Sequence, residues 1–125
     1  MKTLSLIFLT ILFSISTVFA QEIEKKLIEG KWHIKKFDVG SDKNSFKENT
    51  KDYYWFNFSD DNTYTSKFLL EESSGNYTFN EDTKALTFDF KNLQDVPLVI
   101  SQTEDGLFEL NGKVGRKKIL ILLYQ

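Results

Sequence analysis

Apolar and polar residues alternate through most of this chain, which is the pattern of β-strands that bury one face. In residues 31–39, Trp32 and Ile34 alternate with Lys31, His33 and Lys35. Clusters of Asp, Asn, Ser and Gly separate the alternating segments and favour turns, because these residues tolerate turn conformations. The pattern predicts eight strands, over residues 31–39, 53–59, 63–70, 76–80, 84–90, 96–103, 107–110 and 118–124.

The segments between these strands are mostly short. Residues 73–75 and 111–117 are predicted to be connections, because they contain glycine and polar side chains. Residues 40–52 are polar and lack a period, which predicts one long loop. Before the first strand, residues 22–29 place apolar side chains at helical spacing, and Gly30 follows as a stop signal. A short N-terminal helix is therefore expected.

Short connections make neighbouring strands antiparallel, and the lack of a second helix argues against a parallel α/β sheet. Sequential strands that each bury one face can close into a barrel, which leaves no edge strands. We therefore predict an all-β fold, a small eight-stranded antiparallel up-and-down barrel preceded by a short helix. An open sheet or a sandwich is the alternative. The predicted inner face consists of Trp32, Ile34, Tyr54, Phe56, Phe58, Tyr64, Phe68, Tyr77, Phe79, Leu86, Phe88 and Phe90.

The first 20 residues have the pattern of a secretory signal peptide. Met1-Lys2 supplies a positive start, residues 4–18 are largely apolar, and Val18-Phe19-Ala20 resembles a cleavage site. We predict cleavage near Ala20, a barrel domain over residues 21–125, and a secreted or periplasmic location. An uncleaved membrane anchor is the alternative, which the shortness of the apolar stretch disfavours. No membrane span is expected after cleavage.

Four short motifs resemble, in order and spacing, the lipocalin-like domains of exported bacterial proteins, especially of the Bacteroidetes type. They are Gly30-Lys31-Trp32, the aromatic hairpin of residues 55–64, Gly75-Asn76-Tyr77 and Asp105-Gly106-Leu107. The resemblance implies a ligand-binding barrel. It also implies that Gly30 and Trp32 form a structural plug covered by a basic residue near the last strand. Arg116 is the nearest match, and the alternative is that Arg116 is a solvated loop residue.

The resemblance further implies a small apolar ligand in the barrel mouth, with residues 40–52 as a lid that carries Phe46. A solvated loop is the alternative for the lid. Phenylalanines can also fill a small barrel, so a solid-core structural or protein-interaction domain is the alternative function. The predicted lining and lid residues are Phe46, Tyr54, Phe56, Phe58, Phe68, Phe79, Phe88 and Phe90.

Other functional classes have little support in the sequence. The chain has no cysteine and one histidine, His33, on the predicted outer face. We therefore expect no enzyme activity, no catalytic residue, no metal site and no cofactor. The formal net charge is −2 with interspersed signs, so nucleic acid is not an expected partner.

The last predicted strand, residues 118–124, is apolar on both faces. One face belongs to the barrel, and the other needs cover. We expect the N-terminal helix to cover it in a monomer. A homodimer formed through this strand is the alternative.

Overall fold

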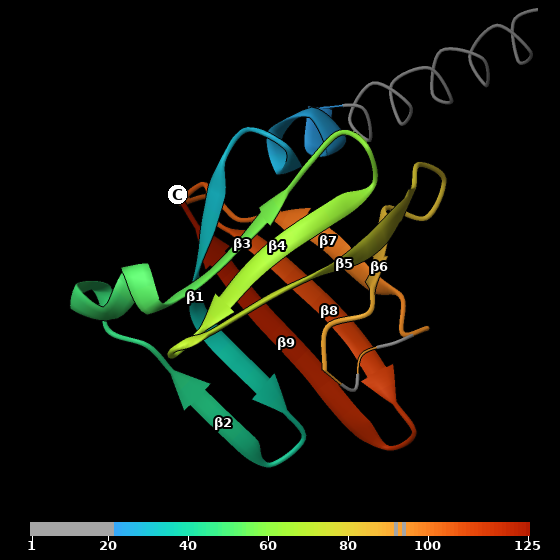
Figure 1. Cartoon of the computed structure of the whole chain (residues 1–125). Helices are drawn as coiled ribbons and strands as arrows, with labels where there is room; N and C mark the ends of the chain where they lie inside the picture. The colour runs from blue at the N-terminus through green and yellow to red at the C-terminus, as the bar shows by residue number, and fades with distance from the viewer. Residues whose placement is uncertain (1–21, 92, 94) are drawn as a thin grey trace, which may run out of the picture.

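The computed structural model describes residues 22–91, 93 and 95–125. The predicted signal peptide therefore lies outside the described residues. A helix over residues 22–27 precedes nine strands that form one sheet (Figure 1). The elements are β1 (Lys31–Val39), β2 (Asp42–Ser45), the 3-10 helix η1 (Glu48–Tyr53), β3 (Tyr54–Phe58), β4 (Thr63–Phe68), β5 (Glu71–Asn80), β6 (Ala85–Phe88), β7 (Leu98–Gln102), β8 (Phe108–Val114) and β9 (Lys117–Tyr124).

Eight of these strands close into an antiparallel barrel. β1 pairs with β3, each following strand pairs with the next, and β9 returns to pair with β1. The closing pair is long and includes Phe37 opposite Ile121 and Val39 opposite Ile119. The predicted all-β, eight-stranded up-and-down barrel with a short N-terminal helix is confirmed.

The ninth strand, β2, corrects the prediction of an irregular loop over residues 40–52. The chain turns at Gly40, where φ is +61°, and β2 pairs with the second half of β1. η1 then leads into β3. All four residues of β2 are exposed, so the sequence has no hydrophobic alternation here that would predict a strand.

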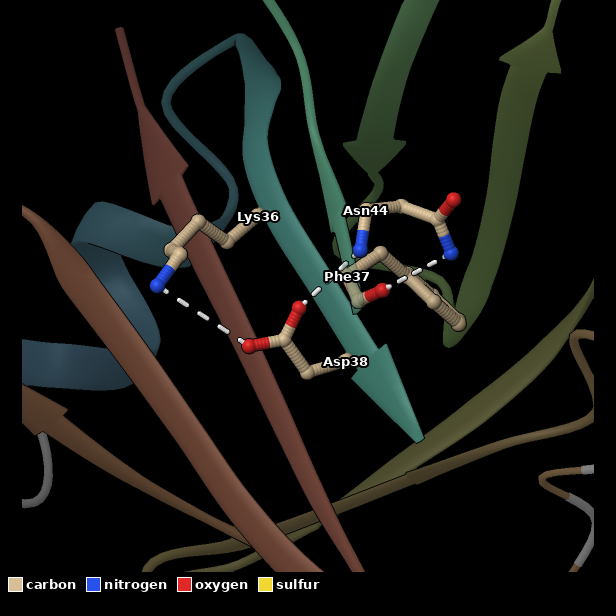
Figure 2. A network of polar contacts seen from close by, with 4 residues as sticks. All are labelled: Lys36, Phe37, Asp38 and Asn44. Carbon is tan, nitrogen blue, oxygen red and sulfur yellow. Dashed lines mark hydrogen bonds and ion pairs between the residues drawn. The ribbon is translucent and has the colours of Figure 1, made fainter. Parts of the chain in front are cut away.

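Polar contacts of Asp38 and Asn44 hold the β1–β2 hairpin (Figure 2). The Asn44 backbone N–H donates to Asp38 Oδ1 (3.2 Å), and Asn44 Nδ2 donates to the Phe37 carbonyl (3.4 Å). Lys36 Nζ lies 3.9 Å from Asp38 Oδ2. Asp38 is 7% exposed, so these partners offset the cost of burying its carboxylate.

Two other predicted connections are strand. β5 begins at Glu71, so residues 73–75 pair with β4, and the preceding turn contains Leu69 at φ +61°. β8 continues to Val114, and its turn into β9 contains Gly115 at φ +59°. Polar and glycine residues suggested turns in both places. Both segments nevertheless pair with a neighbouring strand, because the hydrogen bonds of a β-ladder are made by the backbone and not by the side chains.

Residues from every barrel strand fill the interior. Nine of the twelve predicted inward residues are buried, and Tyr54, Phe68 and Phe79 are partly buried against the core. A β-bulge between Ile34 and Lys36 shifts the register of β1, so Phe37 faces the core as well.

The barrel has two unlike ends. At the helix end lie residues 22–27 and the β3–β4, β5–β6 and β7–β8 turns; at the hairpin end lie the β1–β2, β4–β5 and β8–β9 turns (Figure 1). Leu27 is fully buried, and Lys26 Nζ donates to Gln102 Oε1 (3.3 Å). The helix thus caps one end of the barrel. This corrects the expectation that it covers the outer face of the last strand, where Leu120 and Leu122 are half-buried.

Candidate functional site at the hairpin end of the barrel

The deepest of the predicted lining residues pack against one another. Phe56, Phe58 and Phe88 are at most 2% exposed. The Phe56 ring centroid lies 5.4 Å from that of Phe88 and 4.9 Å from that of Phe90, both edge to face. Edge-to-face contact at these separations is the favoured aromatic arrangement. Phe56, Phe58 and Phe88 therefore form packed core, and Phe90 packs against them.

Three more predicted residues form a stack on the barrel flank, next to the hairpin end. The ring centroids of Phe46 and Tyr54 are 4.1 Å apart, and Phe68 packs on both at 5.7 and 5.0 Å. Phe46 follows β2, and its N–H donates to the Lys35 carbonyl (3.0 Å). Phe79 lies apart from them, near the β5–β6 turn at the helix end.

A pocket of about 290 Å³ opens at the hairpin end. It lies where β5 extends beyond the end of β6. β6 ends at Phe88, opposite Tyr77, whereas β5 begins at Glu71, near the hairpin end. From Glu71 to Gly75, β5 is paired with β4 and has no second strand partner among the described residues. The pocket is lined by Tyr64, Phe68, Glu71, Ser73, Ser74, Asp89, Phe90 and Lys91.

Polar contacts order one wall of this pocket. The Tyr64 hydroxyl donates to Asp89 Oδ1 (2.9 Å), and the hydroxyls of Ser66 and Ser73 are 2.7 Å apart. Gly75 permits the first contact, because a Cβ there would collide with Asp89 Oδ1 and lie 2.9 Å from Tyr64 Cε1. Gly75, which the sequence predicted to lie in a turn, therefore leaves room for the hydrogen bond between Tyr64 and Asp89.

Burial raises the pKa of Tyr64, and the hydrogen bond to Asp89 and the charge of Asp89 raise it further. A phenol whose pKa is raised by folding stabilises the protein fully below pH about 10, its unfolded value. This stabilisation is lost as the pH rises through the folded pKa. We expect the free energy of unfolding to fall between pH 10 and 11.5, as measured by urea denaturation.

Tyr64→Phe tests whether Tyr64 causes this loss of stability at alkaline pH. It should cost about 1 kcal/mol at pH 7, because one hydrogen bond is lost, and it should flatten the fall above pH 10. Tyr77 and Tyr124 also have pKa values raised chiefly by burial, so a residual slope remains. Tyr53→Phe is the matched control, since Tyr53 is 49% exposed. An unchanged alkaline slope in Tyr64→Phe would contradict the assignment.

Lys91 occupies the aromatic side of the pocket. Its Nζ lies 3.5 Å from the ring centroid of Phe68, 5.4 Å from that of Phe90 and 5.9 Å from that of Phe37. Burial lowers the pKa of Lys91, and the negative charge of Glu71 acts in the opposite direction. The backbone of Lys91 is left-handed, with φ +51°.

The structure places Trp32 and Arg116 at opposite ends of the barrel. Trp32 lies at the start of β1, whereas the exposed Arg116 lies in the β8–β9 turn, near the far end of β1. The prediction that Arg116 covers Trp32 is therefore wrong. The indole stacks instead on Phe108 (centroids 4.1 Å apart) and donates to the Leu27 carbonyl (3.0 Å). Gly30, at φ +126°, ends the segment between the helix and β1.

The described residues contain no cluster of three or more side chains of the metal-binding types. His33 Nδ1 donates to the Lys51 carbonyl (2.9 Å), so this ring contacts η1. In the part of the chain that the structure describes, no helix is long and apolar enough to cross a membrane.

Sequence reasoning missed part of the pocket. Phe37, which packs on the pocket residues Phe68 and Phe90, was missed because the bulge in β1 reverses the alternation that precedes it. Glu71 begins β5, whereas Asp89 and Lys91 follow β6, and no spacing in the sequence brings the two segments together. A larger pocket of about 470 Å³ runs along Ile23 and Val99 at the helix end. The hairpin-end pocket is the stronger candidate, because it combines predicted lining residues with converging polar groups.

The fold defines this protein as a small closed β-barrel. Among solved structures it is similar to a DUF4847 family protein from Bacteroides vulgatus ATCC 8482. The TM-score is 0.57 at 12% sequence identity, over 82% of this chain and 97% of that chain. At this identity the similarity shows the fold alone. No protein-family model and no curated protein matches the chain. The lipocalin-like relationship therefore stays a prediction.

Proposed function

We propose that this protein is an exported, lipocalin-like, non-enzymatic carrier that binds a small apolar molecule at the hairpin end of its barrel. Residues 1–20 are its export signal, and the mature protein acts in the periplasm or outside the cell. The observation that carries the proposal is the 290 Å³ pocket with the side chains of Phe68 and Phe90 in its wall. Small-molecule sites are typically concave, with apolar walls and a few oriented polar groups.

The ligand lies at the mouth in this proposal, because Phe56, Phe58 and Phe88 already fill the space below. It contacts the face of Phe68 and the hydroxyls of Tyr64 and Ser73. Phe46 and Tyr54 support Phe68 through edge-to-face ring contacts. Phe56, Phe58 and Phe88 support the site from below, and Phe79 is remote from it.

One experiment tests export and ligand binding together. Native mass spectrometry of the protein purified from its host should show a chain that begins near Gln21 and carries an additional non-covalent mass. Titration of the ligand-free protein with the neutral fluorescent probe N-phenyl-1-naphthylamine should show saturable binding. An uncleaved chain contradicts the predicted signal, and a chain without ligand that also fails to bind the probe contradicts the carrier.

A variant that blocks the pocket tests whether the ligand binds there. Ser73→Trp should weaken probe binding at least about tenfold, because Ser73 shares the inner face of β5 with Tyr77 and the indole would occupy pocket volume. Thr78→Trp is the matched control, since Thr78 is also exposed on β5 and lies outside the pocket. Equal binding by both variants would place the ligand elsewhere.

A solid-core interaction domain is the second candidate, and the dense packing of Phe56, Phe58 and Phe88 favours it. Such a barrel would present its loops to a protein partner and carry no ligand. Lack of both a bound mass and probe binding, in a correctly processed and folded protein, is the result that this candidate expects.

A further inference from the structure

The three phenylalanines around Lys91 form a cage. The ring centroids of Phe37, Phe68 and Phe90 are separated by 6.3, 6.0 and 6.2 Å, so they stand at the corners of a nearly equilateral triangle. Phe37 packs edge-on to both of the other rings. The rings come from β1, β4 and the segment after β6, and only the closed barrel brings them together.

The occupant of the cage is an ammonium group. Lys91 Nζ is within 6 Å of all three ring centroids, which is the range of the cation–π interaction. In the described part of the chain, this ammonium forms no ion pair with a carboxylate. Its main partners are therefore ring faces, and the geometry is that of the aromatic cages that recognise organic cations.

Carboxylates add to the attraction for a cation. Glu71 and Asp89 line the pocket beside the cage, and together their charges exceed the single charge of Lys91. We propose that the Phe37–Phe68–Phe90 cage is a binding site for an organic ammonium group, and that Lys91 occupies it as an internal substitute until the ligand displaces it. This deepens the proposed function and rests on it, since it adds an ammonium group to the otherwise apolar ligand that the same pocket takes.

Two features make this displacement feasible. Lys91 is connected to the cage by a flexible four-carbon side chain, so its ammonium can leave without movement of the barrel. Burial lowers the pKa of Lys91, which means that its charge regains solvation when it moves into water. The adjoining 290 Å³ pocket has room for the rest of a small ligand, against Phe68 and Phe90.

The test compares choline with 3,3-dimethyl-1-butanol, which has the same shape but no charge, by isothermal titration calorimetry. Lys91→Ala vacates the cage and should bind choline about tenfold more tightly than the wild type does. It should also bind choline about tenfold more tightly than the uncharged analogue, because a desolvated cation–π contact is worth about that factor. Lys91→Arg keeps a cation in the cage and should bind choline as weakly as the wild type.

A second variant tests whether the rings themselves recognise the charge. In the Lys91→Ala background, Phe68→Leu removes the ring nearest to Lys91 Nζ and should abolish the preference for choline. Circular dichroism and thermal unfolding confirm that each variant is folded. A parallel arm with phosphatidylcholine vesicles separates the two sources of the group: binding of free choline supports a soluble ligand, and binding to vesicles alone supports a lipid headgroup.

The outcomes separate this inference from the proposed function. If folded Lys91→Ala prefers neither compound, while N-phenyl-1-naphthylamine still binds, the ammonium site is wrong and the carrier stands. If neither the ammonium nor the naphthylamine probe binds, both are wrong. In that case Lys91 only shields three core rings from water.

Discussion

Phe56→Ala should lower the free energy of unfolding by about 3–5 kcal/mol, the range for truncating a buried phenylalanine. Phe56 is 1% exposed and contacts the rings of Phe58, Phe88 and Phe90, with centroids 6.0, 5.4 and 4.9 Å away. Its neighbours belong to the sheet and cannot collapse into the space, so a cavity remains. Urea denaturation measures the change, and the urea dependence should stay that of a cooperative transition.

The size of this effect also tests whether the barrel interior is solid. A side chain that borders an empty or ligand-filled cavity loses fewer contacts on truncation, and its cost would fall below about 2 kcal/mol. The control is Tyr53→Ala, which removes a half-exposed ring just before β3 and should change stability by about 0.5 kcal/mol. Equal costs for both variants would contradict the packed interior.

Trp32→Ala should lower the free energy of unfolding by a similar amount, about 3–5 kcal/mol, because it disrupts the contact between the barrel and the N-terminal helix. Trp32 is 3% exposed, stacks on Phe108 and donates its indole N–H to the Leu27 carbonyl at the end of the N-terminal helix. Its loss removes core volume and the hydrogen bond that attaches the helical segment. Amide hydrogen exchange should show that residues 23–27 lose protection before the barrel does.

Trp32→Phe divides this effect into its parts. Phenylalanine retains a ring against Phe108 but has no N–H for Leu27, so we expect a cost of about 1–2 kcal/mol, mostly from the lost hydrogen bond and volume. Trp55 remains as the fluorescent reporter in both variants. If Trp32→Phe were as costly as Trp32→Ala, stacking on Phe108 would not be the main source of stability.

The hydrophobic alternation predicted the class of fold, because strands of a barrel each bury one face at a period of two. It placed Phe56, Phe58 and Phe88 inside, and these residues are buried. The prediction was weaker wherever the backbone departs from the regular period. The bulge after Ile34 reverses the faces of β1, so the alternation of Trp32 and Ile34 did not extend to Phe37, which is also buried.

The candidate site was predicted only in part. Phe68 and Phe90 were expected to line a pocket and they do, whereas Phe56, Phe58 and Phe88 are packed core. Arg116 was matched to Trp32 by resemblance, and the register of β9 on β1 separates them. Lys91 has no signal in the sequence, since its partners Phe37 and Phe68 are distant along the chain.

The sequence by itself determined the all-β class, the order of the strands and most of the residues that fill the barrel. These properties follow from local periodicity and from short connections that make neighbours antiparallel. The tertiary structure alone decided that β2 pairs with β1, that the helix caps one end, and that three phenylalanines surround Lys91. Those features depend on strand register and on closure of the barrel. A register shift of one residue exchanges the two faces of a strand, and no local sequence pattern specifies the register.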